Sequence, residues 1–234
     1  MSGLAGEAFV AIWHDITPEG LDEFYDWHHR EHMPERLGIP GFRRGRRYVR
    51  CGGEGQTFFN LYEVDCFEVL VGQDYLNRLN APTPWTKRAV QHFRSVTRGL
   101  CRVAGSSGIG QGGTIATLRI TADVGREADL RAFLLRQATP ELMARTGILG
   151  VHLGCADDTG SRIETAEKKA RSNPTDIPSW ILLVEGISQE RLAGGLHAIL
   201  APASLRAHGA AETAPLLGIY ALEATRLKTA WTPG

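Results

Sequence analysis

The residues best suited to chemistry lie in one short run, DWHHREH at positions 26–32. His28 and His32 are four residues apart, so on a helix their side chains share a face, one turn from each other. An imidazole titrates near neutral pH and can both take and give a proton, which suits general acid–base work. We therefore take His32 and His28 as candidate catalytic residues, with the neighbouring Trp27 as a candidate substrate contact.

Two other interpretations of this histidine pair stay open. Both rings could be hydrogen-bonded packing residues beneath the helix. Histidines at this spacing also suit zinc or another transition metal, with His14 or Glu31 as a third ligand supplied by folding. No HExxH motif is present, and we expect no bound metal.

Four arginines follow in the run RRGRRY at 43–48, which is predicted to be part of a strand. Alternation along a strand divides the run into two faces, with Arg44, Arg46 and Tyr48 on one and Arg43 and Arg47 on the other. An inward arginine would bind a carboxylate or phenolate through its planar fork. Arg44, Arg46 and Tyr48 are therefore candidate substrate-binding residues. A solvated strand end, or ion pairs to Asp26 and Glu31, is the alternative.

Further candidates come from two other predicted strands. In FFNLY at 58–62, Asn60 and Tyr62 share a face opposite the apolar residues. His14 lies on the first strand, on the same face as Ile12. Polar and aromatic groups mixed on one sheet face suit the wall of a ligand cavity. Tyr62 is a candidate catalytic residue, and Asn60 and His14 are candidate substrate contacts.

The pattern around these residues predicts a βαββαβ unit. Thr17 and Pro18 form a helix start, and Gly38 and Pro40 end that helix. The predicted strands are 9–16, 42–51, 57–64 and 95–104, and the predicted helical regions are 18–37 and 67–94.

The same order repeats after the Gly/Ser-rich segment GSSGIGQGG at 105–113. The predicted strands of the repeat are 114–122, 150–155, 180–186 and 216–225, and its helices are 127–146 and 189–201, with a polar excursion at 156–178.

Two such units predict an α+β protein of two tandem ferredoxin-like repeats, 1–104 and 114–234, joined by the linker 105–113. Each repeat would have a four-stranded antiparallel sheet with helices on one face. The bare sheet faces must be buried, and packing them sheet to sheet gives a pseudo-dimeric α+β barrel. We expect a monomeric pseudo-dimer or a homodimer.

Composition excludes several classes of protein. Lys plus Arg and Asp plus Glu both number 26, so no charge excess favours nucleic acid or an anionic membrane. No apolar run reaches the roughly 20 residues of a membrane helix, and no signal peptide is recognisable. The four cysteines have no paired spacing and indicate reduced thiols of a cytoplasmic protein. No P-loop or GxSxG motif occurs, so we expect no cofactor.

The run FYDWHHREHMPERLGIPGFRRGRRYV at 24–49 resembles EthD-like proteins of the dimeric α+β barrel superfamily. The matching elements are His32-Met33-Pro34 near the helix end and the following Pro40-Gly41-Phe42-Arg43-Arg44. The resemblance covers about a tenth of the chain. It implies a cavity between helix and sheet in each half, and His32 as the family-type histidine. Relatives include cofactor-free isomerases, cyclases, monooxygenases and haem-degrading enzymes, so fold alone leaves the function open.

The second repeat departs from this pattern. It has Ala138 where His32 would fall, and its next strand carries His152 in place of the arginine pair. We therefore expect a degenerate second site.

The leading hypothesis is a cofactor-independent isomerase, dehydratase or cyclase for a small anionic metabolite, of aromatic or polyketide-like type. His32 would be the general acid/base, His28 its partner and Arg44 or Arg46 the anion clamp. The alternatives are a non-catalytic small-molecule-binding or assembly protein, and a haem or metal-binding oxidoreductase that uses His28 or His32 as an axial ligand.

Overall fold

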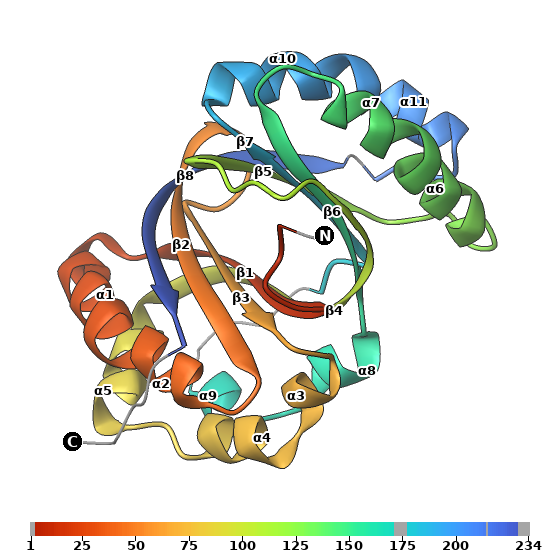
Figure 1. The fold of residues 1–234 in the computed structure, drawn as a ribbon. Coiled ribbons are helices and arrows are strands. Elements are labelled where there is room, and N and C mark those ends of the chain that lie inside the picture. Colours follow the sequence, from red (N-terminus) through yellow and green to blue (C-terminus); the bar gives the residue numbers. More distant parts are fainter. Residues whose placement is uncertain (1–2, 171–176, 214, 229–234) are drawn as a thin grey trace.

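The computed structural model describes residues 3–170, 177–213 and 215–228, and within them eight antiparallel strands close into a barrel (Figure 1). The strands are β1 (Ala8–Ile16), β2 (Phe42–Gly53), β3 (Phe58–Val64), β4 (Phe93–Ser107), β5 (Thr114–Ile120), β6 (Ile148–Ala156), β7 (Trp180–Gly186) and β8 (Leu216–Leu227).

The order of strands around the barrel is β1-β3-β2-β8-β5-β7-β6-β4, with β4 returning to β1. Each half therefore contributes four neighbouring strands in the same order, β4-β1-β3-β2 and β8-β5-β7-β6. The halves join through antiparallel pairing of β2 with β8 and of β4 with β6. Closure leaves neither sheet with a free edge, and the predicted α+β barrel class is confirmed.

Helices cover the outside of the barrel in two groups on opposite sides (Figure 1). The first group comprises α1 (Leu21–Trp27), α2 (Met33–Gly38), α3 (Glu68–Val71), α4 (Gln73–Asn80) and α5 (Pro84–Ala89). The second comprises α6 (Glu127–Phe133), α7 (Thr139–Met143), α10 (Gln189–Ile199) and α11 (Pro202–Ala207).

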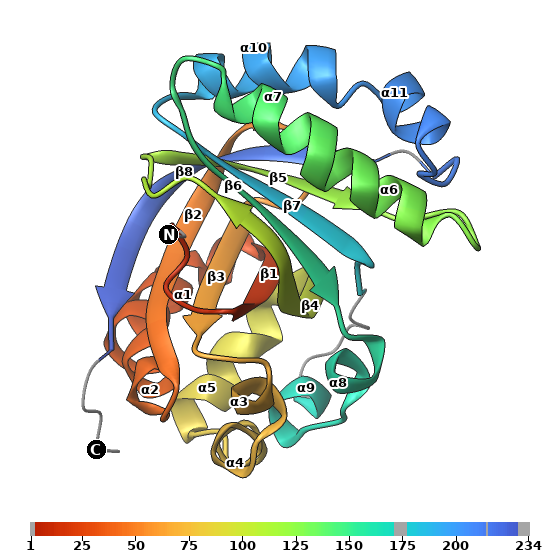
Figure 2. The same cartoon turned by 45° about the vertical axis from the view of Figure 1, so that its right-hand side comes forward.

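Two short helices of the second half lie with the helices of the first. These are α8 (Asp158–Arg162) and α9 (Ala166–Lys169), in the polar excursion between β6 and β7. Figure 2 shows them beside α3 and α4. The Ala166 amide on α9 donates a hydrogen bond to Asn80 Oδ1 at the end of α4, over 3.0 Å. Residues 171–176 of the predicted excursion lie outside the described residues.

The helix expected at 18–37 is interrupted by a π-helical turn, His28–His32, between α1 and α2. A second π-helical turn, Leu134–Ala138, joins α6 to α7. Each turn ends two residues before a proline, Pro34 or Pro140. Proline has no N–H to donate to the carbonyl four residues earlier, and its ring crowds that carbonyl, so the wider turn relieves both problems.

Three other details differ from the sequence-based expectation. β4 continues to Ser107, because Gly105 and Ser106 still pair with β6, so the first residues of the predicted linker form strand. Helix α11 was not expected, and α8 and α9 give the polar excursion local structure.

Within the described part of the chain, every helix is too short or too polar to cross a membrane.

The barrel interior combines aromatic packing with a buried ion cluster. Trp13 donates to Thr117 Oγ1 across the interior over 3.0 Å. Arg46 bridges the two halves, with its Nε 3.0 Å from Glu63 Oε1 on β3 and its Nη1 2.6 Å from Glu185 Oε1 on β7. A buried charge of this kind is tolerated only when it is paired and hydrogen-bonded.

His152 lies in the same interior, fully buried, with its Nδ1 2.6 Å from Ser106 Oγ. Burial, and then the charge of Arg46, lower the pKa of His152 from 6.5 to about 4. Between these two values the unfolded chain binds a proton that the folded chain does not. The stability that a neutral His152 provides is therefore fully present above pH 6.5 and is lost as the pH falls towards 4.

We expect His152→Gln to reduce the pH dependence of the unfolding free energy between pH 4 and 6.5 by up to about 1.4 kcal/mol per pH unit. Urea unfolding at a series of pH values measures this. His197→Gln, at an exposed position of α10, is the matched control and should leave the slope unchanged. Parallel curves for His152→Gln and the unmodified protein would contradict the assignment.

Candidate functional site

A small cavity lies between the first helix and the outer face of the first sheet. Its volume is about 30 Å³, which is room for a water-sized group. Strands, helices α1 and α9 and the π-helical turn all contribute to its wall. The lining residues are Ile12, Trp27, His28, His32, Asn60, Tyr62, Val90, Phe93 and Glu167.

Strand β3 supplies the polar floor of this cavity. Its alternation sends Phe59 and Leu61 into the barrel core. Asn60 and Tyr62 point the opposite way, towards the helix, as predicted. Asn60 Nδ2 lies 2.8 Å from His14 Nε2, and Asn60 Oδ1 is buried with no hydrogen-bond partner among the described residues.

His28 is held between two partners and is almost fully buried. Its Nδ1 lies 3.3 Å from Arg47 Nη1, and its Nε2 lies 3.1 Å from Tyr62 Oη. Burial, with the neighbouring His32 and Arg47 charges, lowers the pKa of His28 well below 6.5. Burial also raises the pKa of the Tyr62 phenol. Both groups are therefore neutral near pH 7.

His32 stands one turn further along and packs against the indole ring of Trp27, with ring centroids 4.3 Å apart. Its ring centroid is 5.6 Å from that of His28 and 6.1 Å from that of Tyr62. Trp27 Nε1 donates to Thr86 Oγ1 over 3.1 Å, so Trp27 offers the cavity an aromatic wall. The predicted histidine pair thus shares one buried face with Tyr62.

The arginine beside this cavity is Arg47, a member of the predicted 43–47 arginine run that was not among the candidate contacts. Arg44, Arg46 and Tyr48 share the opposite face of β2, as their alternation predicted, but that face is the barrel interior. Arg44 Nε lies 2.9 Å from Glu63 Oε1 there. The structure therefore does not bring these three candidates to the histidines, and neither arginine can clamp an anion in this cavity.

Glu167 is a second residue that sequence reasoning missed. It comes from α9 in the second half and is buried in the cavity wall, where it pairs with Arg36 of α2. Arg36 Nη1 also lies 2.9 Å from Glu35 Oε2. No sequence pattern indicates this pairing, because 131 residues separate the partners.

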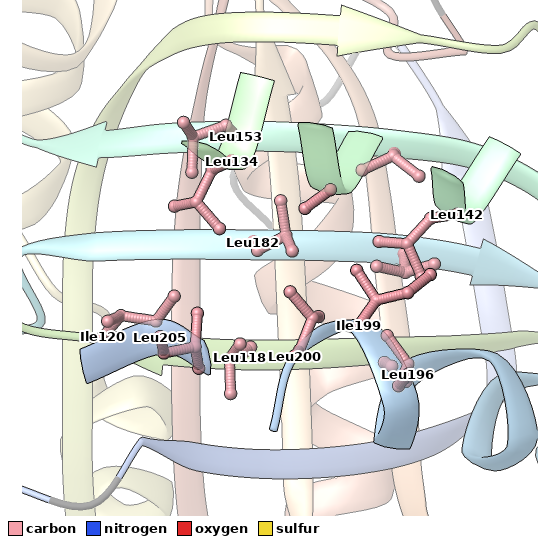
Figure 3. Packing of buried hydrophobic residues seen from close by; sticks show 14 of the residues in the cluster. Leu118, Ile120, Leu134, Leu142, Leu153, Leu182, Leu196, Ile199, Leu200 and Leu205 are labelled. Atoms are coloured by element: carbon pink, nitrogen blue, oxygen red, sulfur yellow. The ribbon is translucent and has the colours of Figure 1, made fainter. Parts of the chain in front are cut away.

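The corresponding region of the second half is apolar. Strand register and the two π-helical turns identify equivalent residues in the two halves. The pairs are His14 and Ile120, His28 and Leu134, His32 and Ala138, Arg47 and Leu153, Asn60 and Leu182, and Tyr62 and Val184. All the second-half members are buried in one hydrophobic cluster, part of which Figure 3 shows. The apolar filling expected of the second half is present.

The residues at the cavity offer little to a metal or haem. Within the described residues, no group of three or more His, Cys, Asp or Glu side chains could hold a metal ion. His28 has Arg47 and Tyr62 at its two ring nitrogens, so it cannot act as an axial ligand in this conformation. A cavity of about 30 Å³ also lies far below the roughly 300–1,000 Å³ of small-molecule sites.

We expect exchange of the side chains at the equivalent positions Asn60 and Leu182 to have unequal effects on stability. Leu182→Asn should lower the unfolding free energy by about 2–5 kcal/mol, because it places an amide in an apolar core. Asn60→Leu should lower it by no more than about 1–3 kcal/mol, because the lost hydrogen bond to His14 Nε2 is partly offset by removal of a carbonyl oxygen that is buried without a partner among the described residues. Urea unfolding of both variants measures the difference. Equal losses would show that Asn60 serves packing.

Comparison with known proteins supports the fold. Neither models of protein families nor curated proteins match the chain. Among solved structures, an anthrone oxidase-like protein superposes with a TM-score of 0.62 at 13% identity, covering 100% of this chain and 99% of the other. A candidate monooxygenase from Fusobacterium nucleatum gives 0.58 at 9% identity, covering 96% of each chain.

A variant of chlorite dismutase from Candidatus Nitrospira defluvii gives a TM-score of 0.54 at 11% identity, covering 94% of this chain and 92% of the other. At identities this low the likeness shows fold and carries no activity across. The narrower EthD-like resemblance stays a prediction. The architecture is that of the dimeric α+β barrels, with both halves in a single chain.

Proposed function

We propose that the first half holds the active site of an enzyme that performs acid–base chemistry on a small aromatic or polyketide-like metabolite without a bound cofactor. The substrate would react through a phenolate or enolate. The observation that carries the proposal is the contrast between the halves. Six polar residues at or beside the cavity have buried apolar equivalents in the second half: His14, His28, His32, Arg47, Asn60 and Tyr62.

This contrast separates chemistry from packing. The second half packs its helices on its sheet with leucine, isoleucine, valine and alanine at these positions. The fold therefore has no need of imidazole, amide or phenol groups there. Buried polar groups cost stability unless they are fully hydrogen-bonded. Their retention in one half alone is typical of a working site, where stability is given up for function.

The imidazole and phenol groups at the cavity suit proton transfer. His32, packed on Trp27, is the proposed general acid/base, which typically contributes about 10²–10⁴-fold. Tyr62, kept neutral by burial, would donate a hydrogen bond to the oxygen on which negative charge develops. Asn60 would orient the substrate through its Oδ1, which has no hydrogen-bond partner among the described residues, with His14 holding its amide nitrogen.

The names of two structural neighbours suggest which compounds to assay, although their likeness to this chain is one of fold. One is described as anthrone oxidase-like, a name that refers to an aromatic ketone, and another as a candidate monooxygenase. An oxygenation would need dioxygen as a second substrate, whereas isomerisation, dehydration or cyclisation would not. A panel of phenolic and polyketide-like ketones should therefore be assayed both in air and without oxygen.

Substrate entry requires the cavity wall to move, because about 30 Å³ holds no aromatic ring. Helix α9 is the part of the wall that the second half supplies. Its Glu167 is tied to Arg36, and its first amide to Asn80. We infer that displacement of α9 enlarges the cavity and that these contacts close it again over the substrate.

We expect His32→Ala to abolish turnover or ligand binding while the protein stays folded, because loss of one cavity-lining ring removes little packing. Ala138→Val, at the equivalent position of the second half, is the matched control. It should lower the unfolding free energy by about 1–3 kcal/mol through overpacking and leave activity intact. Thermal unfolding, ligand titration and the substrate panel measure these effects. Unfolding of His32→Ala with unchanged affinity in the folded fraction would identify His32 as structural.

Metal content tests the haem or metal-binding alternative. We expect a colourless protein with less than about one equivalent of transition metal, because two histidines leave a tetrahedral site half filled. Elemental analysis and the visible absorption spectrum measure this. Stoichiometric zinc, copper or iron that disappears in His28→Ala would overturn the proposal. Binding of a panel compound without turnover would favour the non-catalytic alternative.

A further inference from the structure

We propose that Arg47 is a positioning residue that fixes the tautomer of His28 and thereby makes Tyr62 a hydrogen-bond donor to the substrate oxygen. The inference rests on the proposed function for the role of Tyr62 in turnover. Its physical core, the direction of the hydrogen bonds from Arg47 to Tyr62, can be measured without any substrate.

The direction follows from the chemistry of the guanidinium group. Arginine only donates hydrogen bonds and keeps its charge in proteins. Its Nη1, 3.3 Å from His28 Nδ1, therefore requires an unprotonated Nδ1 that accepts. The single proton of the neutral ring must then sit on Nε2. From there it is donated to Tyr62 Oη, 3.1 Å away.

This tautomer of His28 determines what the Tyr62 hydroxyl can do. Its oxygen accepts from His28, so its own proton is free to be donated elsewhere, and Tyr62 lines the cavity. The opposite tautomer would set an Nδ1–H against the arginine donor and would turn the Tyr62 proton towards His28. Towards the cavity, the Tyr62 oxygen could then only accept a hydrogen bond. Arg47 thus decides whether the site can stabilise a developing oxyanion.

Arg47 is itself held by the second half of the chain. Its Nε donates to Glu223 Oε2 over 2.9 Å, and the other oxygen of Glu223 accepts from Tyr25 Oη, also over 2.9 Å. The guanidinium carbon lies 4.7 Å from the centroid of the Tyr25 ring, a cation–π distance. Glu223 lies on β8, at the register shift of the β2–β8 junction between the partners of Arg47 and Tyr48.

The test is the tautomer of His28, read by long-range proton–nitrogen NMR on the full chain labelled with ¹⁵N-histidine. The His28 signals are assigned by their loss in His28→Gln. In the unmodified protein we expect an unprotonated Nδ1 and a protonated Nε2. A protonated Nδ1, or a doubly protonated ring at pH 7, would overturn the proposal without any variant.

Arg47→Met should release the constraint, so that the Nδ1-protonated form appears. Arg47→Lys should restore the original tautomer, because lysine is also a donor only. Arg43→Met is the matched control, since Arg43 is an exposed arginine of the same strand, and it should leave the spectrum unchanged. An unaltered His28 tautomer in folded Arg47→Met would sink the inference.

With an active substrate, Arg47→Met should lower kcat by about 10²–10³-fold, the usual effect of losing one oxyanion donor, with partial rescue in Arg47→Lys. Tyr62→Phe should give a similar loss, and the double variant should lose little more. A changed tautomer with unchanged kcat would refute the role of Arg47 in turnover. Failure of the proposed function would look different. In that case the unmodified protein would turn over no panel member, although its His28 tautomer would still be the expected one.

Discussion

Closure of two four-stranded sheets into one barrel is the constraint on which the rest of this structure depends. Pairing of β2 with β8 and of β4 with β6 satisfies the backbone groups at every sheet edge. It also divides each strand into an interior face and an outer, helix-covered face. On β2 this places Arg46 inside, between Glu63 and Glu185, and turns Arg47 outwards to His28. One residue step along the strand separates a structural arginine from the one at the site.

The two halves share one architecture but place different residues at its equivalent positions. Each has a π-helical turn ahead of a proline, so each sets two residues of its helix directly over its sheet. In the second half those residues are Leu134 and Ala138 in a closed hydrophobic cluster. In the first half they are His28 and His32. The second half therefore acts as an internal reference for what packing alone requires, and the polar first half departs from it.

The site nevertheless belongs to the whole chain. Glu223 of β8 holds Arg47, and Glu167 of α9 pairs with Arg36 in the cavity wall. Both carboxylates come from the second half. Loss of Glu167 would leave the buried Arg36 without one of its partners, the case in which an ion pair matters most, whereas the Arg47–Glu223 pair is only partly buried. The second half thus contributes to the site through β8 and α9.

The sequence by itself determined the element order, the α+β barrel class and the side of each strand on which a residue lies, because apolar periodicity and alternation are local properties. It placed His28 with His32 and Asn60 with Tyr62 on shared faces. Only the tertiary structure decided which face became the barrel interior, and so removed Arg44, Arg46 and Tyr48 from the site. The sequence also could not predict that Glu167 and Glu223 contribute to the site, since their partners lie more than a hundred residues away. Alternation defines two faces of a strand, but only packing assigns each face its surroundings.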